Sequence, residues 1–163
     1  MQPRFVQALL MELKARGIRT VVETCGFADP AVICRLSRWV DLFLYDVKLM
    51  DSDKHRQFTG VPNEVILRNL KMLAEQGCAV TVRVPLIPGV NDDSKNIGEL
   101  SEFLSSVRLR EIDLLPYHRI GSGKYHRLQM ADRMAAVDPP STEQMEEVAA
   151  RLRREGFCVR IGG

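Results

Sequence analysis

Hydrophobic positions in this chain alternate between a helical spacing and short continuous runs. Apolar side chains on one face of residues 3–17 predict a helix that begins at Pro3 and ends at Gly17. Apolar or β-branched runs follow, separated by segments of helical period. The predicted strands are 19–24, 42–48, 79–87, 112–118 and 157–161. Strands that alternate with amphipathic helices form a parallel sheet through right-handed crossovers, so the sequence predicts an α/β fold.

Local signals predict where several helices begin and which faces are buried. Asp29 before a proline is a favourable helix start, and Asn63 is expected to cap a helix that follows it. Ser141 and Gln144 form a capping box. The apolar stripe of the first helix, which we expect to be buried, contains Phe5, Val6, Leu9, Leu10 and Leu13.

Two further expectations concern polar and apolar segments in the middle of the chain. A short helix is predicted within 52–60, where His55 lies in a polar stretch and is expected to be solvated, as is His126. The apolar run 42–45 indicates a strand that is covered on both faces.

The composition is that of a globular protein with one hydrophobic core. Of 163 residues, 45% are hydrophobic and 27% are charged, which excludes intrinsic disorder, collagen and coiled coil. A chain of this length buries roughly 70% of the surface of its unfolded state. Residues 1–163 are therefore expected to form a single domain.

Charge and hydropathy argue against two classes of partner. The formal net charge is only +2, with basic and acidic residues interspersed, so no nucleic-acid partner is expected. No apolar run approaches the roughly 20 residues of a membrane span, and the first residues lack the pattern of a signal peptide. We therefore expect no membrane partner and a cytoplasmic location.

The cysteines do not have the spacing of a metal site. They are Cys25, Cys34, Cys78 and Cys158. Paired thiolates that hold one ion are usually separated by roughly two to four residues, and no pair here is so close. All but Cys25 are flanked by apolar residues and are expected to behave as small hydrophobic side chains. The sequence predicts no metal ligand and no disulfide framework.

Polar side chains gather at the predicted carboxyl ends of the strands, where ligands bind in parallel α/β folds. Asp46 and Lys48 lie two residues apart on one strand, so both point to the same face. An acid and an amine side by side suit the ammonium and carboxylate groups of an amino acid. An ion pair that only fills the mouth of a barrel is the alternative. The full set at this edge is Glu23, Thr24, Asp46, Lys48, Arg83, Tyr117 and His118.

Arg83 and His118 each have two interpretations. Arg83 lies between two valines of an apolar strand, where an unpaired guanidinium is costly, so it should pair with an acid. That acid belongs either to a ligand or to the protein, in which Glu23 and Asp46 are the candidates. His118 ends a strand, where it either donates to a ligand or caps a loop.

Four short sequence motifs carry more information than composition does. The motifs, and the order in which they follow one another along the chain, resemble the C-terminal part of the glycyl-radical-enzyme activating enzymes. These are radical S-adenosylmethionine proteins, and the pyruvate formate-lyase activating enzymes are among them. The resemblance covers roughly residues 3–160. The motifs are Thr-Cys-Gly-Phe at 24–27, Asp-Leu-Phe-Leu-Tyr-Asp-Val-Lys at 41–48, Arg-Val-Pro-Leu-Ile-Pro-Gly-Val-Asn-Asp at 83–92, and Leu-Leu-Pro-Tyr-His at 114–118, followed by Gly121 and Lys124-Tyr125.

This resemblance implies a fold and two cofactors. Family members form an incomplete (β/α)6 barrel, of which this chain would supply roughly the last four strands and their outer helices, a partial barrel. They bind S-adenosylmethionine, for which this chain would hold a partial site. They also bind a [4Fe-4S] cluster through a C-x3-C-x2-C motif, which this sequence does not contain.

The resemblance also implies roles for single residues. Asp46 and Lys48 match the pair that faces the methionine end of the cofactor, and His118 matches a histidine near the adenosine. Arg83 matches an arginine that meets the glycyl-bearing peptide of the partner. The cofactor-binding set implied in this way is Glu23, where the family often has Asp beside a bound cation, with Thr24, Asp46, Lys48 and His118.

The implied activity is an oxidoreductase reaction of the complete family member. S-adenosylmethionine is cleaved reductively, and hydrogen is abstracted from a glycine of the partner, a glycyl radical enzyme such as pyruvate formate-lyase. We expect this chain to be a fragment of such an enzyme, inactive alone. Two alternatives stay open: a non-catalytic half-barrel interaction module that self-associates through edge strand 19–24, and a Schiff-base aldolase that uses Lys48.

Overall fold

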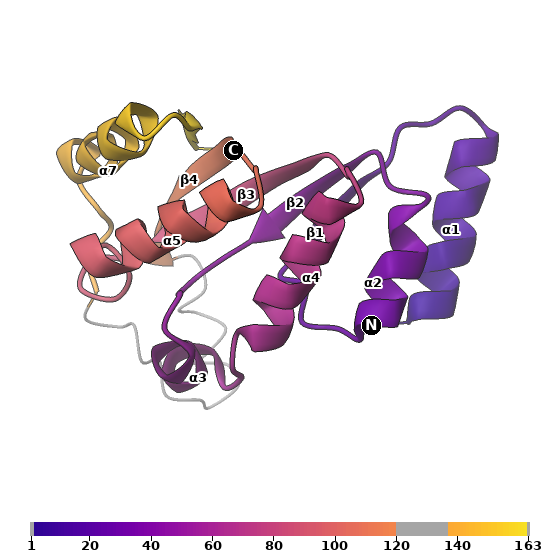
Figure 1. Cartoon of the computed structure of the whole chain (residues 1–163), viewed down its shortest axis with the longest axis horizontal. Coiled ribbons are helices and arrows are strands. Elements are labelled where there is room, and N and C mark those ends of the chain that lie inside the picture. Colours follow the sequence, from indigo (N-terminus) through magenta and orange to yellow (C-terminus); the bar gives the residue numbers. More distant parts are fainter. Residues whose placement is uncertain (1, 120–136, 163) are drawn as a thin grey trace.

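The structure is a computed structural model that describes residues 2–119 and 137–162 (Figure 1). Its centre is a five-stranded parallel sheet in the order β1-β2-β3-β4-β5, so each strand pairs with the next one in sequence. The α/β fold class and the parallel sheet are confirmed. The strands are β1 Val21–Thr24, β2 Leu42–Asp46, β3 Val80–Leu86, β4 Glu111–Pro116 and β5 Cys158–Ile161.

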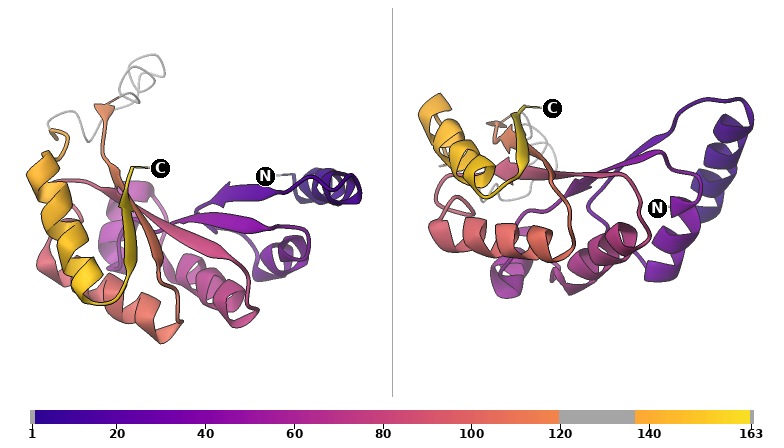
Figure 2. Two further views of the ribbon diagram at one scale, coloured as in Figure 1. Left: turned by 90° about the horizontal axis from the view of Figure 1, so that it is seen from above. Right: turned by 45° about the horizontal axis from the view of Figure 1, so that its top comes forward.

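Helices α2, α4, α5 and α7 lie along one side of the twisted sheet, as Figure 2 shows from above. Helix α1 lies beside β1 at one end of the molecule, and α3 follows β2 at the carboxyl edge of the strands. Within the described residues, no helix is long and apolar enough to cross a membrane. The bounds are α1 Pro3–Ala15, α2 Pro30–Ser37, α3 Ser52–Thr59, α4 Glu64–Glu75, α5 Ser94–Ser106 and α7 Thr142–Arg154.

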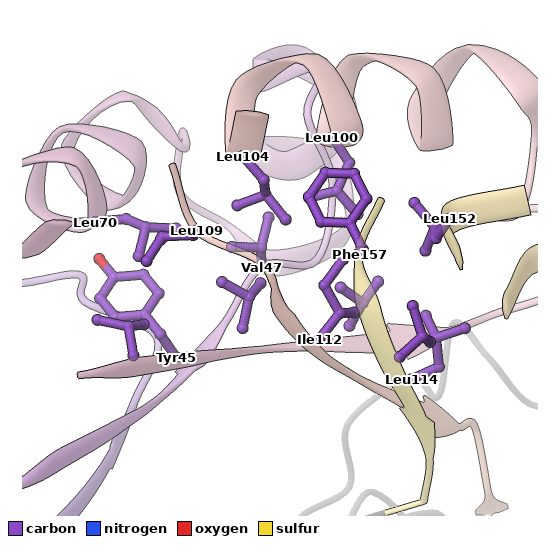
Figure 3. Packing of buried hydrophobic residues seen from close by; sticks show 14 of the residues in the cluster. Tyr45, Val47, Leu70, Leu100, Leu104, Leu109, Ile112, Leu114, Leu152 and Phe157 are labelled. Carbon is purple, nitrogen blue, oxygen red and sulfur yellow. The ribbon is translucent and has the colours of Figure 1, made fainter. Parts of the chain in front are cut away.

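The hydrophobic core fills the space between the helices and the sheet (Figure 3). Alternate residues of the strands contribute to it, as period-two geometry requires. On β2, Tyr45 is fully buried and its hydroxyl donates to the carbonyl oxygen of Ile66 at 2.6 Å, which ties the strand to α4. Burial raises the pKa of Tyr45, so the phenol stays protonated as a donor.

Helix starts that depend on local hydrogen bonds form as predicted. The Asp29 side chain accepts from the backbone N–H of Ala31 at 2.8 Å. Ser141 and Gln144 make both bonds of the capping box, with N–O distances of 2.8 and 3.2 Å. These partners lie within three residues of each other, so the sequence alone contains them.

Two polar residues behave differently from expectation because their partners are distant in sequence. Asn63 occupies the N-cap position of α4, but its side chain makes no capping bond and instead donates to the carbonyls of Leu49 and Met50. The expected solvation of His55 is wrong. This side chain is buried, with Nδ1 2.7 Å from the carbonyl oxygen of Val61.

The burial expected for the first helix and for β2 is only partly found. In α1, Leu10 is buried, but Phe5 and Leu9 are 64% and 46% exposed. On β2, the expected cover on both faces is not found among the described residues. Leu42 and Leu44 are half-buried, and the four helices that cover the sheet lie on the opposite face.

Candidate functional site

The sheet face opposite the helices carries a row of alternating charges. Asp46 on β2 is in register with Arg83 on β3, which is in register with Asp113 on β4, and Asp113 with Arg160 on β5. Partners in register on parallel strands point to the same face. Residues that flank this row on β2, β3 and β4 belong to the core on the helix side. We call Asp46, Arg83, Asp113 and Arg160 the charged row.

Arg83 is bound by two carboxylates of the chain. Its Nε donates to Asp46 Oδ1 at 2.9 Å, and Nη2 contacts both that oxygen and Oε1 of Glu23. The Arg83 side chain is only 15% exposed, whereas that of Glu23 is 63% exposed. Arg83 is therefore paired with both of the acids that the sequence predicted as its internal partners, Glu23 and Asp46.

Lys48 extends this cluster toward the carboxyl edge of the sheet. Its Nζ lies 3.4 Å from Asp46 Oδ2, so Asp46 is placed between two cations. Lys48 follows the last residue of β2 by two positions and keeps the face of Asp46, as their spacing predicts. We call Glu23, Asp46, Lys48 and Arg83 the four-charge cluster.

The cluster is electrically neutral as a whole. The hydrogen bond from Arg83 lowers the pKa of Glu23, although partial desolvation opposes this effect. The same bond, opposed by desolvation, raises the pKa of Arg83, which is also bound to Asp46. By formal charge, the two carboxylates of the cluster balance its two cations.

Sequence reasoning missed the second half of the charged row. Arg160 Nε donates to Asp113 Oδ1 at 2.8 Å, and the Asp113 side chain is only 6% exposed. These residues are joined by strand register rather than by closeness in sequence. The available signal was an acid within the apolar strand 112–118, the same kind of signal that singled out Arg83.

Thr24 does not join the four-charge cluster. It alternates with Glu23 along β1, so its side chain lies on the helix side of the strand. Its Oγ1 accepts from the backbone N–H of Gly26 at 2.9 Å and closes a turn directly after β1. The structure thus gives Thr24 a role in shaping the loop beside Glu23.

The loop after β1 is fixed by contacts from two other elements. Gly26 has φ +68°, and a Cβ atom there would lie 1.6 Å from the hydroxyl oxygen of Tyr45, so this position requires glycine. Asn69 on α4 is fully buried and donates to the carbonyls of Gly26 and Ala28 at 2.8 and 2.9 Å. Sequence reasoning missed Asn69, although a polar residue at an inward position of α4 was a signal.

His118 follows β4 by two residues and is exposed. The backbone N–H of Tyr117 donates to the carbonyl of Leu86, so His118 lies at the carboxyl edge of β3 and β4. No hydrogen bond or ion pair among the described residues joins it to the four-charge cluster. Four residues of the sequence argument, Gly121, Lys124, Tyr125 and His126, lie outside the described residues.

An iron–sulfur cluster does not fit the residues of this chain. Within residues 2–119 and 137–162, no group of three or more His, Cys, Asp or Glu side chains could hold a metal ion. Of the four free cysteines, only Cys34 on α2 and Cys78 before β3 line a common cavity, whereas Cys25 follows β1 and Cys158 lies on β5. A cluster of this kind needs several thiolates together.

The four-charge cluster fits a ligand that carries one cation and one anion close together. Carboxylate oxygens of Asp46 and Glu23 can accept from an ammonium group, and Lys48 and Arg83 can donate to a carboxylate. A separate cavity of about 220 Å³ lies between α5 and α7, on the helix side of the sheet. Its lining includes both acids and arginines, among them Asp92, Glu147, Arg151 and Arg154.

Comparison with known proteins gives one family and a consistent group of relatives. The Radical SAM superfamily matches residues 1–100. The chain is 38% identical over 161 residues to the trans-4-hydroxy-L-proline dehydratase activating enzyme of Clostridioides difficile, covering 98% of this chain and 53% of the relative. It is 42% identical over 165 residues to the choline trimethylamine-lyase activating enzyme of Oleidesulfovibrio alaskensis, covering 99% of this chain and 53% of the relative.

A solved structure matches the fold over nearly the whole chain. It is a domain of a pyruvate-formate lyase-activating enzyme from Bacteroides vulgatus, with a TM-score of 0.83 and 34% identity, covering 99% of this chain and 91% of that chain. The chain spans about half the length of the curated relatives named above.

Proposed function

The chain belongs to the radical SAM superfamily, and from this membership we propose that its four-charge cluster is the methionine-binding part of an S-adenosylmethionine site. The predicted resemblance to glycyl-radical-enzyme activating enzymes is confirmed by the relatives. The partial (β/α) barrel is confirmed as well, because the sheet matches a domain of such an enzyme. That residues 1–163 form one domain stays a prediction.

One observation carries the proposal. Two acids and two cations meet within hydrogen-bond distance on the sheet face that the helices leave open, near the carboxyl ends of β1 and β2 and beside the middle of β3. The methionine end of the cofactor carries one ammonium and one carboxylate group. Each ligand charge therefore finds an opposite partner, and the exchange of internal for external partners keeps the cluster neutral.

Each residue of the site has a proposed role. Asp46 and Glu23 accept from the ligand ammonium, and Lys48 donates to the ligand carboxylate. Arg83 holds the two acids in place and, as its match in the family implies, contacts the glycyl-bearing peptide of the partner. His118 lies near the adenosine, and Thr24 shapes the loop beside the site.

The reaction of the whole protein is part of the proposal. S-adenosylmethionine supplies radical chemistry in this superfamily, and the proposed partner is a glycyl radical enzyme of the pyruvate formate-lyase kind. In complete members an iron–sulfur cluster would supply the reduction of the cofactor, and the described residues of this chain do not bring together a set of metal ligands for it. The contribution of this chain is to bind and orient the cofactor, and we propose that it is inactive alone. The proposed compartment is the cytoplasm, where four free thiols stay reduced.

Binding of S-adenosylmethionine to the 163-residue chain, followed by ligand-detected NMR, tests the proposal. The wild-type chain is expected to bind weakly, and Lys48→Gln is expected to weaken binding by about tenfold, because the ligand carboxylate loses its cationic donor. The matched control is Lys71→Gln, which removes a lysine that is ion-paired with Glu75 on the outer surface of α4. Equal binding by Lys48→Gln and Lys71→Gln, or none by the wild type, contradicts the proposal.

A second function is favoured by the exposed edge of the molecule. Apolar side chains on α1, on β1 and in the segment between them are open to solvent, with Phe5 64%, Ile18 47% and Val21 55% exposed. Strand β1 ends the sheet and leaves backbone groups unpaired, so we propose that this edge self-associates. Light scattering is expected to show dimers that Val21→Lys dissociates, and a monomer at high concentration would contradict it.

The aldolase alternative is not favoured. A Schiff-base lysine requires a desolvated amine. Lys48 instead keeps 36% of its side chain exposed and is ion-paired with Asp46.

A further inference from the structure

The segment that carries Lys48 leaves the sheet and loses its strand partner. Strand β2 is paired with β3 up to Asp46, and the backbone N–H of Val47 still donates to the carbonyl of Arg83 at 2.9 Å. Beyond this point the chain turns toward α3, so the peptide groups of 48–50 need other partners.

Asparagine side chains supply these partners. Asn91, from the loop between β3 and α5, donates through Nδ2 to the carbonyl of Lys48 and to that of Pro85, both at 2.7 Å. Its Oδ1 accepts from the backbone N–H of Ile87 at 2.8 Å. One fully buried amide thus joins the end of β2 to the end of β3.

Two more asparagines continue the same arrangement. Asn63 donates to the carbonyls of Leu49 and Met50 at 2.9 and 2.7 Å. Asn96 accepts from the backbone N–H of Met50 at 2.9 Å and donates to the carbonyl of Asn91 at 2.8 Å. All three asparagines are buried, which makes their amide bonds costly to leave unmade. We call Asn63, Asn91 and Asn96 the asparagine collar.

Asn91 is the member of the collar that is bonded to the Lys48 peptide itself. Its other bonds attach it to Pro85 of β3, the strand that carries Arg83, and to Ile87 directly after that strand. Asn91 thus bonds the backbone from which the Lys48 side chain reaches Asp46. Without its Nδ2 donor, the carbonyls of Lys48 and Pro85 lose their shared partner.

We propose that Asn91 is a positioning residue that holds Lys48 in the four-charge cluster in the orientation needed to meet a ligand carboxylate. The ligand part of this inference rests on the proposed function, whereas the orientation of Lys48 is measurable without any ligand. Asn91 itself need not touch the ligand, because it acts through the Lys48 backbone.

The first test measures the Lys48–Asp46 contact directly in the 163-residue chain. Lysines are labelled by reductive [13C]methylation, and the Lys48 signal is assigned by its loss in Lys48→Arg. Asp46→Asn is expected to shift this signal in the wild-type background, and to shift it by less than about half as much in Asn91→Ala, because the contact is loosened. An equal shift in the two backgrounds overturns the proposal.

Asn69→Ala is the matched control for loss of a buried amide. Asn69 also donates two bonds to backbone carbonyls and is fully buried, but it holds the loop after β1 rather than the segment 48–50. In the Asn69→Ala background, Asp46→Asn is expected to shift the Lys48 signal as much as it does in the wild-type background. We call this shift the Lys48 response. An equal loss of response in Asn69→Ala and Asn91→Ala would make the effect one of general destabilisation and overturn the proposal.

A second variant keeps the test decisive if Asn91→Ala does not fold. Asn91→Asp retains the shape and the acceptor for Ile87 but removes the Nδ2 donor. Loss of the Lys48 response in this variant supports the proposal, and a retained response overturns it.

Titration with S-adenosylmethionine then separates the two proposals. Asn91→Ala is expected to weaken binding by about tenfold, and unchanged binding overturns the positioning role. If the wild-type chain binds no S-adenosylmethionine while the Lys48 response still depends on Asn91, the proposed function fails and the positioning of Lys48 stands.

Discussion

Tyr45 and Asp46 are neighbours on β2 that lie in opposite environments. Tyr45 faces the helices, is fully buried and bonds to a backbone carbonyl of α4. Asp46 faces the open side, where it is bound to Arg83 and Lys48 and is still 22% exposed. The helix side of the sheet is thus apolar and closely packed, whereas the open side carries paired charges.

This difference separates stability from binding along a single strand. Apolar contacts on the helix side stabilise the fold by removing apolar surface from water. The side chains that make them carry no charge that a ligand group could pair with. Ion pairs on the open side contribute less to stability because part of their attraction offsets desolvation. They can, however, exchange an internal partner for a ligand group. The following predictions test this separation.

Leu70→Ala is expected to have the largest effect on stability and none on the charges of the open face. Leu70 is fully buried in the core, so its truncation should lower the free energy of unfolding by about 2–5 kcal/mol. Urea denaturation followed by circular dichroism measures this, with Lys71→Ala on the exposed face of the same helix as control. A loss below about 1 kcal/mol would show that the helix side does not dominate stability.

Arg83→Met is expected to have a smaller effect, because it leaves Asp46 with Lys48 as its partner. The loss should be about 1–3 kcal/mol, as for a hydrogen bond between charged groups that are mostly shielded from water. The double variant Arg83→Met with Asp46→Asn should lose less free energy of unfolding than the sum of the losses in the two single variants. Additive losses would mean that the pair is not coupled.

Glu23→Gln is expected to change stability by only about 0.2–1 kcal/mol, because the Glu23 side chain is 63% exposed. The difference from wild type should shrink further at high salt, which screens an exposed ion pair. Denaturation at low and high ionic strength measures it. A loss that is large and independent of salt would place Glu23 in a buried network instead.

The last prediction concerns Asp41, which lies outside both faces and whose contribution to stability depends on pH only in the acid range. A hydrogen bond from the Lys14 side chain, together with one from the backbone of Thr20, lowers the pKa of Asp41 to about 2. The folded pKa lies below the unfolded value of about 3.9, so this contribution is complete above about pH 4 and is lost as pH falls toward 2. The melting temperature of Asp41→Asn should depend less steeply on pH across this range than that of the wild type. An equal slope in the two proteins would contradict a contribution from the Asp41 carboxylate.

The sequence predicted those features whose partners are near in sequence or repeat with a fixed period. The positions of the strands along the chain, the capping box at Ser141 and the shared face of Asp46 and Lys48 are of this kind. The pairing of Arg83 was narrowed to Glu23 and Asp46 because a guanidinium in an apolar strand needs an acid.

The remaining features depend on contacts that only the folded chain creates. Asn63 is joined to carbonyls 13 and 14 residues away, and Asp113 to an arginine 47 residues away. Their partners follow from strand register and loop packing, which one sequence does not specify. Exposure of Phe5 has the same origin, because an amphipathic stripe does not reveal which element covers it.

The most direct test of the central claim is NMR mapping of S-adenosylmethionine on the ¹⁵N-labelled chain. Backbone signals of residues 46–50, Arg83 and Glu23 are expected to change on titration, while those of the α5–α7 cavity stay in place. Changes confined to the cavity between α5 and α7, or no saturable change at the four-charge cluster, would contradict the account.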